Sequence, residues 1–216
     1  MKRCLLFAFL LPNFCVSQDT ITNNILTTKK FVKGIYVTFR EFKENSPSIL
    51  EDFIIKADTS EFERYELLVP NSKKKFRNVY GFSDGESVFI NAQTYEQRAY
   101  FVKMLILGKI IYFEDARAKT KIIGMNNAAV GHLLGGIIVA SILYAEAAKR
   151  SVKNPGFVVY MPDDDGRPFI LETKTLRSIL KEGDPELSKN YQEESDKNNH
   201  KVLIKYILEF NRRHHD

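Results

Sequence analysis

The stretch AYFVKMLILGKIIYFED, residues 99–115, sets the main requirement for the fold. Two apolar runs flank Gly108-Lys109, and this pattern predicts a β-hairpin that turns at those two residues. Each run is apolar on both faces, with Lys103 as the exception. A strand with two apolar faces must be covered on both sides, so we expect another element to pack over this sheet.

The segment AAVGHLLGGIIVASILYAEAA, Ala128–Ala148, is the obvious cover, because it is rich in Gly and Ala and carries no charge before Glu146. We expect a Gly/Ala-rich apolar helix over residues 126–148 that is buried against the sheet. Its length also permits a membrane span, and Gly131-x-x-x-Gly135 is a close-packing motif of membrane helices.

Two observations favour burial over a span. The flanks of the segment are equally basic, so the positive-inside rule gives no orientation; the cations are Arg117, Lys119, Lys121, Lys149, Arg150 and Lys153. A crossing would also leave the hairpin that we predict at 156–173 alone on the far side, and an isolated two-stranded hairpin is marginally stable in water. We therefore expect a buried helix and keep membrane anchoring through residues 128–148 as the alternative.

The N-terminus has the pattern of a cleaved signal peptide over residues 1–17. Lys2 and Arg3 form a charged start, an apolar run follows from Leu5 to Leu11, and a small residue, Ser17, precedes the expected cut. Pro12 interrupts the run too early for an uncleaved anchor. The sequence thus predicts an exported protein of the periplasm or cell envelope, whose mature chain is a single domain over 18–216.

Removal of the signal peptide also removes both cysteines, Cys4 and Cys15. The mature chain would then have no disulfide, no thiolate nucleophile and no cysteine-bound metal. The formal charge falls from +5 to +3, because Lys2 and Arg3 leave with the signal. This mild surplus gives no basic stripe of the kind that nucleic-acid binding uses, and we interpret Lys73-Lys74-Lys75 as a solvated loop.

Residues 32–118 have mostly the pattern of β-strands. Asp84-Gly85 predicts a tight type I′ hairpin turn between two apolar runs. Thr38 and Glu41 have the spacing of a capping box, so a short helix is expected between Thr38 and Asn45. With the helices predicted after residue 174, the fold class is α+β: an antiparallel β-rich N-terminal part, the apolar helix, a further hairpin and C-terminal helices.

The C-terminal part combines one hairpin with helices. A hairpin is predicted over 156–173, turning at Asp163–Gly166, and a helical part over 175–213. Asp184-Pro185 is typical of a helix start, because Asp caps the helix and Pro suits its first turn. A helical stripe at i, i+3, i+4 and i+7 predicts a final amphipathic helix that docks on the core; it comprises Leu203, Tyr206, Ile207 and Phe210.

Motifs for catalysis or cofactor binding are absent from the sequence. It has no Gly-x-Ser-x-Gly elbow, no His-Glu-x-x-His, no phosphate-binding glycine loop and no dinucleotide fingerprint. Glu114-Asp115 at a strand end could form an acid/base pair, although no partner for it is evident. His132 within the apolar segment suits a pH switch or a ligand, but a buried core histidine is the more common role.

Two clusters resemble metal sites only loosely. Asp163-Asp164-Asp165-Gly166 resembles part of a calcium loop, but the glutamate that such a loop needs is displaced to Glu172. His214-His215-Asp216, with His200 upstream, is better interpreted as a solvated terminus. The sequence therefore predicts no catalytic, cofactor-binding or metal-binding residues and no cofactor.

Three groups of residues resemble an uncharacterised exported protein family of Bacteroidota, which is a domain of unknown function. They are the run from Gly34 to Ser48, the run Tyr80–Gly85, and the closing Pro185-Glu186-Leu187 with Tyr206-Ile207 and Asn211. The resemblance covers most of the mature chain. It implies export and a shared fold, and it implies no site residues.

Two functions from different classes remain open. The first is a non-catalytic binding or structural module of the envelope, whose partner would be an envelope protein, a glycan or the membrane surface. The second is an envelope hydrolase that uses an Asp/Glu pair, since carboxylates are the abundant catalytic type left in the mature chain. A cleft lined by two carboxylates would favour the hydrolase, and a closed apolar sheet with scattered carboxylates would favour the binding module.

Overall fold

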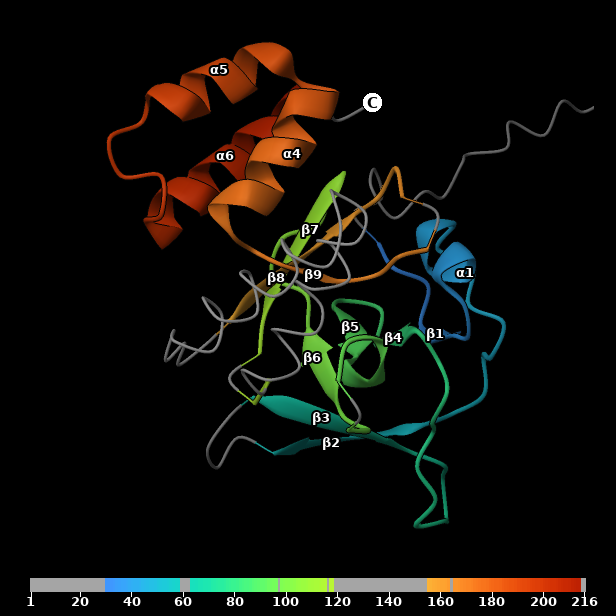
Figure 1. The fold of residues 1–216 in the computed structure, drawn as a ribbon. Coiled ribbons are helices and arrows are strands. Elements are labelled where there is room, and N and C mark those ends of the chain that lie inside the picture. Colours follow the sequence, from blue (N-terminus) through green and yellow to red (C-terminus); the bar gives the residue numbers. More distant parts are fainter. Residues whose placement is uncertain are drawn as a thin grey trace, which may run out of the picture.

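A computed structural model describes residues 30–58, 63–96, 98–115, 117–118, 155–163 and 165–214. The structure consists of two antiparallel sheets and a group of C-terminal helices, so the predicted α+β class is confirmed. The helices lie at one end of the molecule over the smaller sheet, and the larger sheet lies at the other end (Figure 1). The expected apolar helix over 126–148 lies outside the described residues.

The larger sheet has six antiparallel strands. Their order is β1 (Gly34–Tyr36), β4 (Gly81–Ser83), β5 (Val88–Asn91), β6 (Phe101–Lys103), β3 (Arg64–Leu68) and β2 (Ile54–Asp58). Ile49 pairs with Ile35 beside β1, and the chain then enters β2 at the opposite edge, so the sheet curls toward closure. Its inner face holds an aromatic and aliphatic cluster of Ile35, Leu67, Val79, Phe82, Phe89 and Phe101.

The smaller sheet has the order β7 (Ile110–Glu114), β8 (Gly156–Tyr160) and β9 (Phe169–Ile170). The pairing of β8 with β9 confirms the hairpin predicted over 156–173. All five residues of β8 are buried, as expected for a strand that is covered on both of its faces. This sheet is therefore a middle layer.

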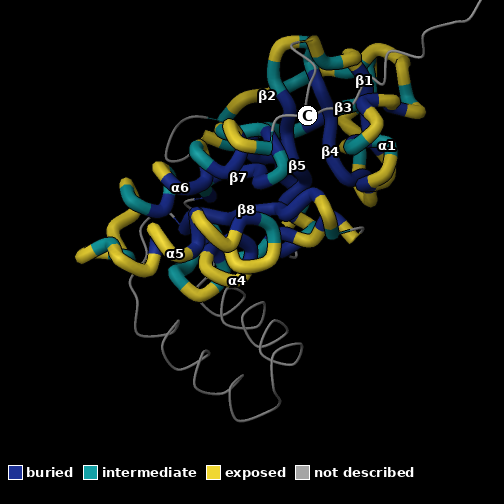
Figure 2. The backbone as a smooth tube through the Cα atoms, turned by 90° about the horizontal axis from the view of Figure 1, so that it is seen from above, coloured by how far each residue is buried: buried dark blue, intermediate teal, exposed yellow. Residues whose placement is uncertain are grey.

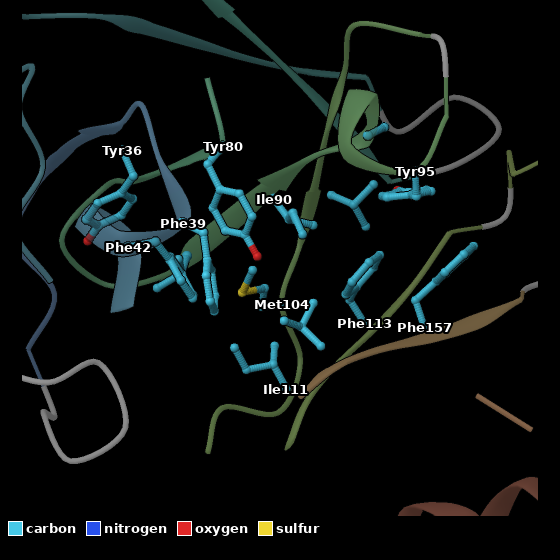
Figure 3. Close-up of a cluster of buried hydrophobic side chains, with 14 of the residues drawn as sticks. Tyr36, Phe39, Phe42, Tyr80, Ile90, Tyr95, Met104, Ile111, Phe113 and Phe157 are labelled. Atoms are coloured by element: carbon cyan, nitrogen blue, oxygen red, sulfur yellow. The ribbon is translucent and has the colours of Figure 1, made fainter. Parts of the chain in front are cut away.

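One face of the smaller sheet packs on the outer face of the larger sheet. Ile111, Phe113, Phe157 and Val159 meet Ile90 and Val102 there. Short helix α1 (Phe39–Lys43) adds Phe39 and Phe42 to the same cluster, and the ring of Tyr95 lies beside those of Phe113 and Phe157 (Figure 3).

The other face of the smaller sheet is covered by α4 (Thr173–Gly183), α5 (Pro185–Glu193) and α6 (His200–Arg213). The predicted stripe of α6 is confirmed, because Leu203, Tyr206, Ile207 and Phe210 are all buried. The helices expose their outer sides, whereas the strands beneath them are buried (Figure 2). The C-terminal helices thus cover this face, which the sequence did not predict, because an apolar strand face does not specify its partner. The expected cover by residues 126–148 falls outside the described residues and stays a prediction.

Local caps largely form as the sequence predicts. Thr38 Oγ1 accepts a hydrogen bond from Glu41 N at 3.2 Å and begins α1. Glu41 Oε2 accepts in return from Val37 N at 2.7 Å, one residue before the usual position. At the start of α5, Asp184 accepts from Leu187 N at 2.8 Å, with Pro185 in the first turn.

Two predicted turns differ from the structure. The hairpin of β4 and β5 forms, but Ser83 pairs with Val88, so its loop runs over Asp84–Ser87 and is not a two-residue turn. The chain also turns near Gly108, where Ile106 pairs with Tyr112. However, β6 and β7 belong to different sheets, because β6 pairs with β5 and β3, and β7 pairs with β8. An apolar pattern on both faces does not determine which strands pair.

Asp115 and Pro155, the residues at the two ends of the sequence between β7 and β8, lie side by side. The strands pair along their whole length, from Ile110 with Tyr160 to Glu114 with Gly156, and Asp115 N donates to Pro155 O at 3.1 Å. The alternative of membrane anchoring through residues 128–148 falls on residues outside the described ranges and stays a prediction. Among the described residues, no helix combines the length and apolarity that a membrane crossing requires.

At Ile110, the edge of β7 that faces away from β8 is closed by a side chain of α6. Asn211 Oδ1 accepts from Ile110 N at 2.8 Å, and Asn211 Nδ2 donates to Ile110 O at 2.8 Å. The amide thus replaces a neighbouring strand at this residue. Gly108 permits the approach, because a Cβ atom there would lie 2.3 Å from Asn211 Cγ.

We predict that Asn211→Ala lowers the free energy of unfolding by about 2–4 kcal/mol, because it leaves two buried backbone groups of Ile110 without partners. Urea denaturation of the mature chain measures the change. Asn190→Ala, an exposed change in α5, serves as the control and should stay within about 0.5 kcal/mol of wild type. Equal effects of the two changes would contradict the proposed role of Asn211.

Candidate functional site

The candidate pair Glu114-Asp115 lies at the end of β7, and its two side chains belong to two different groups of residues. Successive side chains of a strand point to opposite faces. Asp115 accordingly faces the larger sheet, and Glu114 lies on the helix side, near His200. The two carboxylates therefore do not act as one acid/base pair, and each has hydrogen-bond partners that the sequence had not revealed.

Asp115 belongs to a buried group that we call the inner cluster: Tyr95, Glu96, Tyr100 and Asp115. The Tyr95 hydroxyl lies 2.7 Å from Asp115 Oδ2, and the Tyr100 hydroxyl lies 2.6 Å from the same oxygen. Tyr100 also lies 2.9 Å from Glu96 Oε2. Glu96 is 3% exposed and Asp115 is 4% exposed, so substrate in solution has almost no access to either carboxyl.

A short turn of the larger sheet supplies the partners of Asp115. The helical turn η1 (Ala92–Thr94) begins after Asn91, whose side chain caps it by accepting from Gln93 N. Ala92 N then donates to Tyr100 O at 2.8 Å, which closes the loop and brings Tyr95 and Tyr100 to the same side. The loop has no regular hydrophobic pattern in the sequence, so this placement was not predicted.

Burial governs the electrostatics of the inner cluster. Burial raises the pKa of Asp115, and hydrogen bonds from Tyr100 and Tyr95 offset part of that rise. Burial, together with the negative carboxylates nearby, also raises the pKa of both tyrosines well above its ordinary value. All of these shifts favour protonated side chains.

A second group, the outer cluster, comprises Tyr112, Glu114 and His200. The Tyr112 hydroxyl contacts Glu114 Oε1 and lies 2.8 Å from His200 Nε2. The side chains of His200 and Glu114 are 50% and 35% exposed, so water reaches this group. The outer cluster joins the end of β7 to the first turn of α6. Burial is the largest cause that raises the pKa of Tyr112, followed by its contact with Glu114.

Within the part of the chain that the structure describes, the other sequence candidates do not assemble into a site. In the predicted Asp163–Gly166 turn, Gly166 has a φ of 59° and its carbonyl accepts a hydrogen bond from Tyr80, so Gly166 packs against the core, whereas Asp165 is exposed. His214 stacks on Phe210 at the end of α6. Lys73, Lys74 and Lys75 are exposed, as predicted.

Across the described residues, no group of three or more His, Cys, Asp or Glu side chains is placed to hold a metal ion. His132, Asp164, His215 and Asp216 were also considered as candidates in the sequence, and they lie outside the described residues.

Replacing a tyrosine by phenylalanine should lower the free energy of unfolding by different amounts in the two clusters. We predict that Tyr100→Phe lowers the free energy of unfolding by about 1–3 kcal/mol, because it removes the hydroxyl between two buried carboxyl groups. Tyr112→Phe should cost about 0.5–1 kcal/mol, because Glu114 and His200 can bind water instead. Urea denaturation compares the two variants, and a larger loss for Tyr112→Phe would contradict this assignment.

Comparisons with known proteins give a family but no function. No curated protein and no solved structure matches the chain. One family matches residues 34–214, from the first strand to the end of α6. The chain therefore belongs to this family, which is described as a family of unknown function (DUF6563).

Proposed function

We propose that the protein is exported to the cell envelope and acts there as a non-catalytic binding module for the membrane surface. Export is supported by the charged start, the apolar run and the small residue of residues 1–17. The lack of cysteine after residue 17 suits an oxidising compartment. The membership in a family of unknown function is compatible with this proposal and does not test it.

The non-catalytic role is supported by what the described carboxylates do. The one pair that shares a hydroxyl group, Glu96 and Asp115, is buried between the sheets and bound to tyrosines. A glycoside hydrolase needs two carboxyl groups that reach the substrate from a cleft. The alternative of an envelope hydrolase therefore has less support, because this pair stabilises the interior.

The observation that carries the proposal is the pairing of β7 with β8. It holds Asp115 and Pro155 together, and the uncharged sequence 128–145 lies between these two residues in the chain. Among the described residues, sheet and helices cover both faces of β7. An uncharged apolar sequence next to strands that are already covered is suited to binding an apolar surface.

The charges beside this sequence favour a lipid surface. Six cations lie within six residues of Asp115 or Pro155, namely Arg117, Lys119, Lys121, Lys149, Arg150 and Lys153. Asp115 and Pro155, which flank these cations in the sequence, lie side by side. Basic residues beside an apolar segment attract anionic lipid headgroups. We infer peripheral binding in which the apolar sequence contacts the bilayer and the cations contact the headgroups.

Export is tested at the N-terminus. We predict that protein recovered from its native host begins at or near Gln18, because signal peptidase cuts after Ser17. Mass spectrometry of the intact chain measures this. Recovery of a chain that still contains residues 1–17 would contradict export by this route.

Membrane binding is tested by deletion. We predict that residues 18–216 sediment with vesicles of phosphatidylglycerol and phosphatidylcholine at low salt and are released by alkaline carbonate. Replacing residues 119–154 by a short Gly-rich linker should abolish sedimentation and keep a cooperative unfolding transition, because the linked ends already meet. The control replaces the six cations by Gln, and this variant should bind more weakly and lose its dependence on salt.

Two results would overturn the proposal. One is a wild-type protein that stays in the supernatant with anionic vesicles at low salt. The other is a deletion variant that fails to fold, because the apolar sequence would then belong to the core, as the sequence analysis first expected.

A further inference from the structure

In the inner cluster, the close oxygen–oxygen contacts outnumber the hydrogen atoms that the tyrosine hydroxyls can donate. Three contacts join the four side chains: Tyr95 to Asp115 at 2.7 Å, Tyr100 to Asp115 at 2.6 Å, and Tyr100 to Glu96 at 2.9 Å. Each distance is that of an O–H···O hydrogen bond, and each such bond needs one hydrogen atom. A phenol carries one hydrogen, so the two tyrosines supply two.

The third hydrogen must come from a carboxyl group. Tyr100 can donate to Glu96 or to Asp115, but not to both at once. If both carboxyls were ionised, one of the two contacts of Tyr100 would bring together two oxygens with no hydrogen between them. A protonated carboxyl removes this conflict, because it donates to the Tyr100 oxygen while Tyr100 donates to the other carboxyl.

The surroundings favour Asp115 as the protonated partner. Arg98 Nε lies 3.7 Å from Glu96 Oε1, and this cation favours a negative charge on Glu96. Asp115 lies in the cluster of Tyr95, Phe113 and Phe157, where burial disfavours its charged form. In this arrangement Asp115 donates to Tyr100, Tyr100 donates to Glu96, and Tyr95 donates to Asp115.

We propose that this shared carboxyl proton is a pH-sensitive latch, which holds the end of β7 on the larger sheet and releases it when the proton is lost. Loss of the proton puts two negative charges on either side of one phenol oxygen in a buried place. The repulsion acts between the loop after η1 and the end of β7, which no strand pairing joins. The contact between the two sheets is therefore tighter in acid than in base.

The described charged and titratable groups that contact Asp115 or its partners come from the loop before β6 and from its own segment. The loop before β6 contributes Tyr95, Glu96 and Tyr100, and Arg98 of this loop contacts Glu96. On its own segment, Asp115 Oδ1 accepts from the backbone N of Arg117 at 2.8 Å. From β8, Phe157 contributes an apolar ring beside Tyr95.

The direction of the pH effect follows from proton binding. The pKa of Asp115 is raised in the folded protein, mainly by burial. Between the ordinary pKa of an aspartate and this raised value, the folded state binds one more proton than the unfolded state. Stability from this group is thus complete below the ordinary value and is lost as pH rises through the raised value. In that window the folding equilibrium constant falls about tenfold per pH unit because of this group.

The test compares the mature wild type with Asp115→Asn by urea denaturation from pH 4 to pH 8. Asparagine is neutral at every pH, so it removes the titration. Its Nδ2 can donate to the oxygens of Tyr100 and Tyr95, while its Oδ1 accepts from Arg117 N. We expect the folding constant of the variant relative to wild type to rise about tenfold per pH unit within the window. Glu114→Gln, a change to the neighbouring half-exposed carboxylate, is the control, and its ratio to wild type should change far less.

A measurement on the wild type covers the case in which Asp115→Asn fails to fold. Carbon-13 NMR of the Asp115 carboxyl should show the protonated chemical shift at pH values where exposed aspartates are ionised. Glu96→Gln should lower the pH at which this signal changes, because it removes the negative neighbour. A carboxyl of Asp115 that titrates as an exposed aspartate does, or parallel stability curves for wild type and Asp115→Asn, would overturn the latch.

Discussion

The fold depends on one strand that must be buried on every side. Strand β7 is apolar on both faces, so it requires two covers, and its backbone groups require partners along both edges. The larger sheet covers one face, the C-terminal helices cover the other, and β8 pairs with one edge. At Ile110 the amide of Asn211 completes the second edge from a helix more than a hundred positions away in the chain. The three layers are thus the solution to a single local constraint.

Local features of this fold could be predicted, because they depend on neighbouring residues. Thr38, Asp184 and Pro185 act within one helical turn, and the stripe of α6 repeats at helical spacing. The choice of partner could not be predicted, because an apolar face does not specify which other apolar face will cover it. The sequence does contain a signal for the edge contact. Asn211 lies four residues after Ile207, within the buried stripe, and a polar residue there needs a hydrogen-bond partner.

The site shows the same division between local and long-range information. Glu114 and Asp115 are adjacent in sequence, and for that reason a strand separates them onto opposite faces. The partners of Asp115 come from the irregular loop after η1, which has no periodic pattern. Tyr95 and Tyr100 enter the core because each places an apolar ring among other rings and a hydroxyl against a carboxyl. Only the folded arrangement reveals that these hydroxyls are too few for the contacts that they make.

The position of the inner cluster connects the stability of the core with the proposed binding role. Asp115 lies shortly before residues 119–154 begin, and its backbone N–H donates to the carbonyl of Pro155 on the return. The entropic cost of closing a loop rises only slowly with its length, so a long sequence between two paired strands is tolerated when its ends are well fixed. Here the strand pairing fixes the ends to each other, and the inner cluster fixes them to the larger sheet. The two chain positions that flank residues 119–154 are therefore held by contacts among the described residues alone.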